Sequence, residues 1–552
     1  MISLFHKKQT WRWFSPRVKT RNFTIIGGLV IVVLTIVVLV AVSQLDVIRE
    51  YFSRASGKPA DLTINTKAVL GPLPRPWRHL AQGGEGHDWR LQPLAGQVKA
   101  IKPAYIRIDH LYDFYDIVQG TPGNLSFDFS KLDPLLDDIL ATGAKPYIAL
   151  SYMPPAISAG DIVAKPQRWQ DWQLVVQKTV EHISGTKGIS EVYYEVWNEP
   201  DLFGGWKYYG DKNYLTLYTY AVKGAQNARG VKPFKIGGPG ITALYKNWFD
   251  ALAKHAIANN LRYDFFSWHR YTTNLNQYPK DIGDVYAWIQ QYPQLEPTLE
   301  FHITEWGHDS ENHTGYDGRY GAAHTVAGAI KMTGLVQKAF VFEIQDGKDP
   351  QGQAHWGRWG LFTHQDAGAQ AKPRYYALQM LDSLGDQRLE VSGEGYWVKA
   401  LAARDNQGNT QVVVVNYDAY AKHSENVPIT FTNIQPGKYL LKTQLLNGQA
   451  QEQQVATTAA ILKTQLVMPV NTVAKVELSS LNNPEPIATP RPILPDQDAG
   501  QAKHQPYPTA QPINLSGEQS STSPYGSAGA TQSTQDNKSE TINQQPSPIR
   551  IY

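Results

Sequence analysis

The stretches VYYEVWNEPD at residues 192–201 and LEFHITEWG at residues 299–307 decide the fold. Each stretch contains several β-branched and aromatic residues, which favour a strand. Each then reaches a glutamate, Glu199 or Glu305, that is followed within two residues by a proline or a glycine. Because proline and glycine end regular strand pairing, we predict that both glutamates lie at the carboxyl end of a buried strand.

On both sides of these stretches, short apolar runs alternate with amphipathic ones. The runs with strand character are residues 105–108, 145–150, 192–197, 234–237, 265–268, 299–304 and 339–344. Residues 132–140 and 169–183 repeat their apolar positions at helical spacing. Alternating strands and helices predict an α/β protein with a parallel sheet, and a span of about 320 residues fits a (β/α)8 TIM barrel. We expect this barrel at residues 67–385. A doubly wound sheet is the alternative, but no glycine-rich phosphate-binding turn follows an early strand.

The pattern changes after a helix predicted at residues 372–384. Between residues 386 and 481, strand-like runs are separated by turn sequences such as DNQGN and QPGK, which is typical of a small all-β sandwich. Residues 482–552 are rich in Pro, Gln, Ser and Thr and poor in apolar side chains, so we predict a disordered tail.

The N-terminal region has the pattern of a membrane anchor. Residues 23–43 are uncharged and apolar over a length that crosses a bilayer as a transmembrane helix, and the leader at residues 1–22 is basic. The positive-inside rule places this leader in the cytoplasm and the rest of the chain, after a linker at residues 44–66, outside. A cleaved signal peptide is the alternative, with a small-residue site at residues 41–43. We expect an uncleaved, single-pass signal anchor.

Composition excludes several classes of function. The chain of 552 residues has a formal net charge of +3, which gives no indication of a nucleic-acid partner. It contains no cysteine, which excludes thiol nucleophiles and zinc–thiolate sites. His302 and His308 lack metal-ligand spacing, so we expect no metal and no cofactor. The 15 Trp and 30 Tyr fit either a large core or surfaces on which sugar rings stack.

Two carboxyl groups at strand ends of one barrel are the chemical groups needed to cleave a glycosidic bond. One carboxyl group donates a proton to the leaving oxygen, and the other acts as nucleophile or base. In a barrel such groups lie at the carboxyl ends of the strands, where the loops form the site. Glu199 and Glu305 meet this requirement, and the amide of Asn198 is placed to hydrogen-bond a sugar hydroxyl.

The WNEP sequence at residues 197–200 and the TEWG sequence at residues 304–307 together resemble clan A of the glycoside hydrolases, and specifically family 39. Further stretches that carry the resemblance are YIRIDH (105–110), FKIGGP (234–239) and FFSWHRY (265–271). That family includes β-xylosidases, α-L-iduronidases and exopolysaccharide hydrolases. The resemblance implies a retaining mechanism in which Glu199 is the acid/base and Glu305 is the nucleophile.

Side chains around the two glutamates are further candidates. By the resemblance, Arg107 is the arginine beside the nucleophile; the alternative is a core ion pair with Glu195, and both can hold. His269 and Tyr271 lie two residues apart on a predicted strand, so both can face the cleft, and Tyr271 is placed to hydrogen-bond Glu305.

The chain departs from the family pattern at two places. Family members often have a histidine two places after the arginine, whereas this chain has Asp109 there and His110 next. The eighth strand lacks the tryptophan common in the clan. Glu343 or Asp346 near its end either contacts substrate or braces a loop.

Aromatic side chains near the glutamates are candidate platforms for sugar rings. Trp306 directly follows Glu305, and Trp356 is the candidate for the aromatic ring that the eighth strand lacks. The same role is predicted for Trp206, Tyr208, Tyr209 and Trp359. Several platforms suit several sugar subsites, so we expect a cleft that takes a polymer rather than a single terminal sugar.

These observations predict a membrane-anchored retaining glycoside hydrolase that acts on an extracellular or periplasmic polysaccharide or oligosaccharide by double displacement. Two alternatives stay open. One is a transglycosylase that remodels exported polysaccharide with the same residues, and the other is a non-catalytic carbohydrate-binding barrel. The presence of both glutamates argues against the second alternative.

Overall fold

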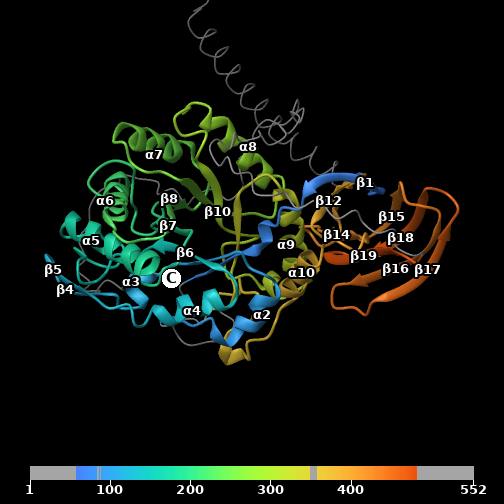
Figure 1. Ribbon diagram of the computed structural model, residues 1–552, viewed down its shortest axis with the longest axis horizontal. Coiled ribbons are helices and arrows are strands. Elements are labelled where there is room, and N and C mark those ends of the chain that lie inside the picture. The colour runs from blue at the N-terminus through green and yellow to red at the C-terminus, as the bar shows by residue number, and fades with distance from the viewer. Residues whose placement is uncertain (1–56, 84–85, 88, 348–356, 482–552) are drawn as a thin grey trace, which may run out of the picture. The chain divides into compact units, whose positions relative to one another are not determined.

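The computed structural model describes residues 57–83, 86–87, 89–347 and 357–481 (Figure 1). The transmembrane segment predicted at residues 23–43 and the disordered tail predicted at residues 482–552 lie outside the described residues. Within the described part of the chain, no helix is both long enough and apolar enough to cross a membrane.

Eight parallel strands close into a barrel, as the alternation of strand and helix patterns predicted. In chain order they are β2 (His79–Gln82), β3 (Tyr105–Ile108), β6 (Lys145–Leu150), β7 (Val192–Val196), β8 (Phe234–Ile241), β9 (Phe265–Tyr271), β10 (Glu300–Gly307) and β11 (Lys338–Phe342). The first of them, β2, was not among the predicted strands. Its four residues HLAQ are too short and too mixed in character to show a period.

Helices surround the barrel and bury their apolar faces against it (Figure 1). They are α2 (Ala95–Ala100), α3 (Leu111–Phe114), α4 (Asp133–Ala141), α5 (Trp169–Val180), α6 (Tyr214–Asn227), α7 (Lys246–Ala258), α8 (Gln277–Ile289), α9 (Arg319–Met332) and α10 (Pro373–Asp382). Between β3 and α4, a small hairpin is formed by β4 (Val118–Thr121) and β5 (Asn124–Phe127). The helix predicted at 169–183 is α5 together with the first part of a π-helical turn, Glu181–Thr186.

The alternation of side chains along each strand decides which groups reach the interior of the barrel. On β3, Ile106 and Ile108 pack into the core shared with the helices, whereas Tyr105 packs against the aromatic cluster inside the barrel. Because successive side chains point to opposite faces, Arg107 also points inward. The cluster inside the barrel consists of Ala81, Tyr147, Tyr193, Phe265, Phe340 and Phe342.

The second part of the described chain is a nine-stranded sheet with its own hydrophobic core. Its strands are β1 (Leu62–Pro72), β12 (Gln387–Ser392), β13 (Val398–Arg404), β14 (Thr410–Asn416), β15 (Glu425–Thr432), β16 (Gly437–Leu445), β17 (Gln451–Thr457), β18 (Ile461–Met468) and β19 (Thr472–Ser480). A small all-β sandwich was predicted at residues 386–481. The sheet is hydrogen-bonded without a break from β17 to β18, and side chains from β14 and from β15 meet in one core.

The strand β1 corrects the predicted boundaries, which placed a linker at residues 44–66 and the start of the barrel at residue 67. β1 covers the end of one range and the beginning of the other, and it belongs to the all-β part. It pairs antiparallel with β12 and parallel with β15. Leu62 and Ile64 on this strand are fully buried in the β core. The barrel itself begins later, at His79.

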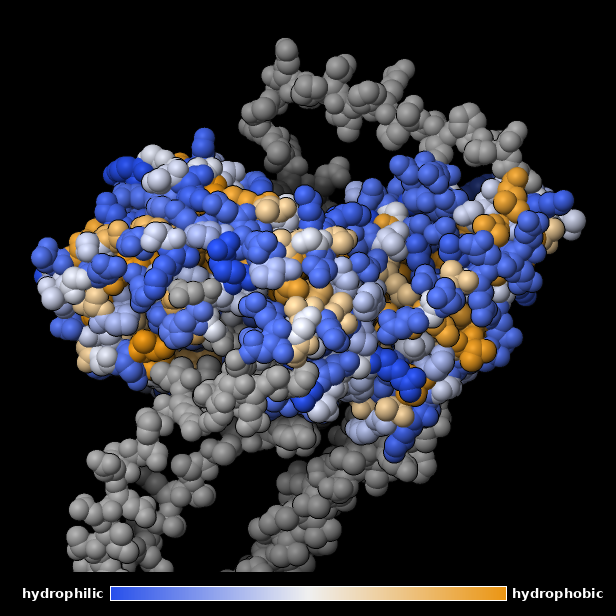
Figure 2. Space-filling model, turned by 90° about the horizontal axis from the view of Figure 1, so that it is seen from below, coloured by the Kyte–Doolittle hydropathy of each residue, from blue (hydrophilic) through white to orange (hydrophobic). Residues whose placement is uncertain are grey.

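The barrel and the nine-stranded sheet share a hydrophobic interface. Helix α9 contacts β13, β14 and β19, and Leu401, Val413 and Val415 pack into the barrel's core. Strand β14 is therefore buried on both faces, which explains its unbroken run of four valines. On the molecular face drawn in Figure 2, apolar surface occurs in small patches separated by hydrophilic residues.

Candidate active site

Glu199 lies in the loop directly after β7 and is held there by backbone hydrogen bonds. Its φ of 45° turns the chain out of the strand direction. Its N–H donates to the carbonyl oxygen of Gly240 (2.9 Å) in β8. Gly240 itself has a φ of 62°, and a Cβ at this position would lie 3.1 Å from the Glu195 carboxyl group, so only glycine fits without displacement.

The loops after β7 and β8 are also joined by side chains. The carboxylate of Asp201 accepts hydrogen bonds from both the backbone N–H (3.1 Å) and the hydroxyl group of Thr242. This contact fixes the segment that carries Glu199 to the neighbouring strand end. The side chain of Glu199 remains 14% exposed, so it is accessible from the mouth of the barrel.

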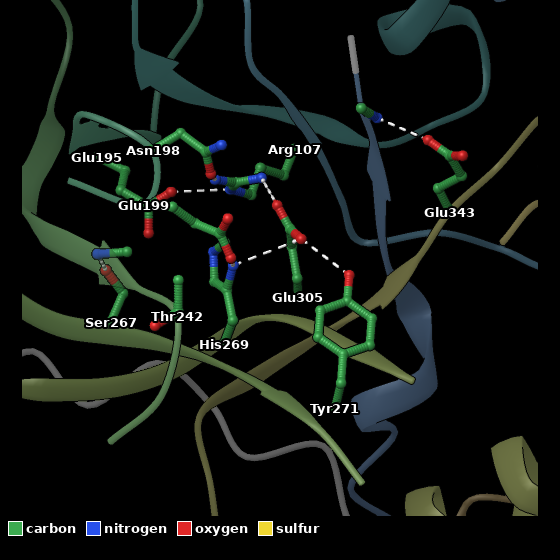
Figure 3. A network of polar contacts seen from close by, with 12 residues as sticks. Arg107, Glu195, Asn198, Glu199, Thr242, Ser267, His269, Tyr271, Glu305 and Glu343 are labelled. Carbon is green, nitrogen blue, oxygen red and sulfur yellow. Dashed lines mark hydrogen bonds and ion pairs between the residues drawn. The ribbon is translucent and has the colours of Figure 1, made fainter. Parts of the chain in front are cut away.

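Glu305 lies inside the barrel near the end of β10, opposite His269 of β9. Arg107 donates from Nη1 to Glu305 Oε1 (2.9 Å), and the hydroxyl group of Tyr271 donates to Glu305 Oε2 (2.9 Å) (Figure 3). The hydrogen bond predicted between Tyr271 and Glu305 is thus observed. Both carboxylate oxygens have a donor, an arrangement that favours the ionised form.

His269 lies between the two glutamates, as Figure 3 shows. Its Nδ1 is 2.8 Å from Glu199 Oε1 and 3.4 Å from Glu305 Oε2. One polar atom from each of Glu199, His269 and Glu305 lies within 4.8 Å of those of the other two. Two carboxyl groups at this separation can act on opposite sides of a single sugar carbon, whereas a wider gap would be needed to seat a water molecule between them.

Arg107 joins three side chains at the centre of the site and is completely buried. Besides Glu305, its guanidinium group donates from Nε to Glu195 (2.8 Å) and from Nη2 to Asn198 Oδ1 (2.7 Å). The two interpretations of Arg107, as the partner of Glu305 and as the partner of Glu195, therefore both hold. Asn198 also donates from Nδ2 to the hydroxyl group of Tyr152 (2.9 Å). Its predicted contact with a sugar hydroxyl stays a prediction.

Burial and neighbouring charges have opposite effects on the pKa values of the buried groups in the site. Burial raises the pKa of Glu305 to about 7, although His269 and Arg107 act to lower it. For His269, burial lowers the pKa, but the negative charges of Glu305 and Glu199 outweigh this effect and leave the pKa raised. An imidazolium at His269 and a carboxylate at Glu305 thus stabilise each other. For Arg107, burial lowers the pKa, and Glu195 and Glu305 more than compensate.

Glu199, His269 and Glu305 form the one group of possible metal ligands found among the described residues. The surroundings do not fit a cation. Both oxygens of Glu305 already accept hydrogen bonds, and one of the donors is the positive charge of Arg107. A metal ion would lie next to this guanidinium group and be repelled by it.

The prediction that Trp306 and Trp206 are platforms for sugar rings is wrong. Trp306 is completely buried and packs against Tyr278 and His324 outside the barrel wall, where Gly328 leaves room for its ring. The reason is the alternation of the strand: Glu305 points inward, so the residue after it points outward. Trp206 is also completely buried, with its ring against Trp197.

The other aromatic candidates differ in their placement. Tyr209 is 59% exposed, and Tyr208 packs against it. Trp359 packs against Phe342 at the end of β11. Trp356 lies outside the described residues, so its predicted contact with substrate stays a prediction.

The acidic residues after β11 brace loops. Glu343 accepts hydrogen bonds from Gln82 Nε2 (3.0 Å) and from the backbone N–H of Gly83 (2.9 Å). Asp346 forms a buried ion pair with Lys372 (2.6 Å). Tyr152, which holds Asn198, was not singled out from the sequence. It follows β6 closely, and no motif in the neighbouring sequence distinguishes it.

Comparison with known proteins gives a consistent picture. The sequence model described as "Glycosyl hydrolases family 39" matches residues 62–444. A β-xylosidase from Caldicellulosiruptor saccharolyticus is 27% identical over 365 residues, covering 60% of this chain and 73% of that protein. A β-xylosidase from Geobacillus stearothermophilus is 26% identical over 367 residues, covering 58% and 68%.

Solved structures share the fold. A monomeric β-xylosidase from Caulobacter crescentus CB15 has a TM-score of 0.64 and 21% identity, covering 76% of this chain and all of that chain. A GH39 enzyme from Xanthomonas axonopodis pv. citri has a TM-score of 0.63 and 20% identity, covering 77% of this chain and 98% of that chain.

Proposed function

The chain belongs to glycosyl hydrolases family 39, and on this basis we propose that it is a retaining glycoside hydrolase with Glu199 as acid/base and Glu305 as nucleophile. The observation that carries the proposal is the position of His269 Nδ1, 2.8 Å from an oxygen of Glu199 and 3.4 Å from an oxygen of Glu305. This geometry brings the two carboxyl groups close enough for direct attack on the sugar.

The reaction takes place in two steps. In the first, a carboxylate oxygen of Glu305 forms a bond to the anomeric carbon while the bond to the leaving oxygen breaks. Glu199 gives its proton to that oxygen. In the second, Glu199 takes a proton from water, the water oxygen bonds to the anomeric carbon, and the ester bond to Glu305 breaks. The sugar keeps its anomeric configuration because it is inverted twice.

The surrounding residues prepare Glu305 for attack. Arg107 and Tyr271 hold its two oxygens in place and favour its ionised form, against the burial that raises its pKa. His269 contacts both carboxyl groups, so a proton on its ring lowers the repulsion between them. Glu199 is the more exposed of the two carboxyl groups and lies towards the mouth of the barrel, where the leaving group departs.

We place the substrate outside the cytoplasm. The apolar run at residues 23–43 behind a basic leader supports a single membrane anchor with the barrel on the outer side. A polysaccharide or oligosaccharide is the substrate class that fits this location. The relatives named β-xylosidase make β-xylosides the first glycosides to test.

The assignment of the two glutamates is tested by azide rescue. Glu199→Ala leaves the nucleophile intact, so turnover should survive on a 2,4-dinitrophenyl glycoside, whose leaving group needs no proton. Azide fills the space of the lost side chain and attacks the glycosyl–enzyme intermediate. We expect a faster reaction and a glycosyl azide with the configuration of the substrate, measured by NMR.

Glu305→Gln is the matched variant for this test. It keeps the shape of the side chain but cannot form the intermediate, so kcat should fall by about three orders of magnitude or more. An inverted azide from Glu199→Ala, or near-normal rates from Glu305→Gln, would contradict the roles proposed here.

The membrane anchor is tested by fractionation of cells that express the full chain. We expect the protein in the membrane fraction, released by detergent but not by high salt, with residues 1–22 still present at its N-terminus. Soluble protein whose N-terminus lies near Ser43 would instead show that the segment is a cleaved signal peptide.

A further inference from the structure

Asp109 is an acidic side chain inside the barrel to which the reaction described above gives no task. It follows β3 directly and continues the alternation in which Tyr105 and Arg107 point inward. The next residue, His110, has a φ of 52° and turns the chain into helix α3. Asp109 is therefore the last inward-pointing residue of this strand, at the mouth of the barrel, where its charge acts on Glu305 and His269.

Oδ1 of Asp109 lacks a hydrogen-bond partner within the described residues. The residue is only 8% exposed, and its Oδ1 is buried without a hydrogen bond. Its neighbours are already engaged with others: Arg107 with Glu195, Glu305 and Asn198, and His110 with Asp113 (2.7 Å). A buried carboxylate without donors is costly, and burial accordingly raises the pKa of Asp109. Such a group is stabilised when a ligand brings the missing donors.

The charges that act on one another around Asp109 are mainly negative. The acidic groups are Asp109, Asp113, Glu195, Glu199 and Glu305, and the basic groups are Arg107, His110 and His269. When all five carboxyl groups are ionised and both imidazoles are protonated, five negative and three positive charges leave a net charge of −2, or −1 when Glu199 carries its catalytic proton. A ligand that brings a further carboxylate here is repelled in a site of low dielectric.

We propose that Asp109 accepts hydrogen bonds from the sugar bound beside Glu305 and that its charge makes this subsite select neutral or cationic sugars against uronic acids. A sugar hydroxyl or ammonium group supplies the donor that Oδ1 lacks. This inference rests on the proposed function, because it assigns the specificity of the same site. It makes Asp109 a specificity-determining residue rather than a participant in bond making.

The test uses the purified protein and three 4-nitrophenyl glycosides that differ only at C5. These are the β-D-xyloside, with hydrogen there, the β-D-glucoside, with a hydroxymethyl group, and the β-D-glucuronide, with a carboxylate. For the wild type we expect kcat/KM on the better neutral glycoside to exceed that on the glucuronide by about 100-fold or more. A wild type that cleaves the glucuronide equally well contradicts the inference without any variant.

Two substitutions then separate the hydrogen bond from the charge. Asp109→Asn keeps the shape and one acceptor oxygen but removes the charge. The ratio of kcat/KM on the neutral glycoside to kcat/KM on the glucuronide should therefore fall about tenfold. Asp109→Ala removes every acceptor and should lower kcat/KM on the neutral glycoside about 100-fold, because the sugar's donor is left unpaired. The inference would be overturned if both variants fold and both keep the wild-type kcat/KM on the neutral glycoside and the wild-type ratio to the glucuronide.

Asp138→Asn is the matched control. Asp138 is also 8% exposed, but it lies on helix α4, outside the barrel, and pairs with Arg90. This variant should keep the wild-type ratio of kcat/KM on the neutral glycoside to kcat/KM on the glucuronide, even if its unfolding temperature changes. If the wild type cleaves none of the three aryl glycosides and no polysaccharide, the proposed function itself is contradicted. Activity that is insensitive to Asp109 contradicts only the specificity assigned here.

Discussion

As the proposed nucleophile, Glu305 must be ionised to attack, yet burial raises its pKa to about 7. Two donors oppose the burial, the guanidinium group of Arg107 and the hydroxyl group of Tyr271. The free enzyme therefore carries a nucleophile whose charge depends on its neighbours, and kcat/KM should fall as the pH drops through the pKa of Glu305.

Tyr271→Phe tests this dependence. The tyrosine hydroxyl stabilises the carboxylate of Glu305, so its removal should raise the pKa of Glu305 further. The acid limb of the kcat/KM profile should then move to higher pH by about one unit, which corresponds to a hydrogen bond to a charged group. Tyr278→Phe is the control, because Tyr278 donates to the carbonyl oxygen of Gly307 instead. An acid limb that stays in place, or an equal shift in both variants, would exclude this role.

At the level of single residues, the sequence was informative wherever strand alternation was applied. His269 and Tyr271, two residues apart on one predicted strand, both point into the site, and Tyr271 makes the predicted hydrogen bond to Glu305. The contact of Arg107 with Glu305 was expected from the family resemblance instead. Strand alternation excludes Trp306 as a platform, because it directly follows an inward-pointing residue. The contacts of His269 with both glutamates could not be predicted, because they depend on how β7, β9 and β10 are positioned relative to one another.

At the level of elements, the catalytic geometry depends on the loops after β7 and β8. Asp201 in the first loop accepts two hydrogen bonds from Thr242 in the second. Glu199 lies two residues before Asp201 and donates its own backbone N–H to Gly240. The position of Glu199, the proposed acid/base, is thus set by a neighbouring strand as well as by its own.

Asp201→Ala should loosen the loop that carries Glu199. We expect kcat on a glycoside with a poor leaving group to fall about tenfold, the loss that corresponds to one hydrogen bond of about 1.4 kcal/mol. The 2,4-dinitrophenyl glycoside needs no proton from Glu199 and should lose much less. Thr242→Ser keeps the hydroxyl group and serves as the control. Equal losses on both substrates would show that Asp201 does not act through Glu199.

At the level of the whole molecule, strand β1 joins the beginning of the described chain to the sheet formed near its end. This strand lies between β12 and β15 in the sheet, although more than 300 residues separate it from either strand in sequence. The eight-stranded barrel was predictable because each strand pairs with neighbours supplied by a regular alternation. β1 was assigned to a linker and to the barrel because nothing near it in the sequence indicates a partner so far along the chain.

The position of β1 predicts where the protein can be shortened. A chain that begins at Lys58 keeps the strand, whereas one that begins at Lys67 loses Leu62 and Ile64 from the β core. Each of these side chains contributes about 1.5–3 kcal/mol when buried, and their sum is a large part of the 5–15 kcal/mol by which a typical domain is stable. We expect the longer chain to unfold in one cooperative transition on heating, and the shorter one to aggregate or to melt far lower.

Point substitutions in the longer chain separate the loss of β1 from the loss of chain length. Ile64→Asp places a charge in the β core and should lower the unfolding temperature, whereas Lys67→Asp changes an exposed position on the same strand and should have little effect. Because α9 packs against β13, β14 and β19, unfolding of the sheet exposes one side of the barrel. Activity should therefore be lost together with the sheet in Ile64→Asp. A barrel that keeps full activity after the sheet has melted would show that the two parts are stable independently.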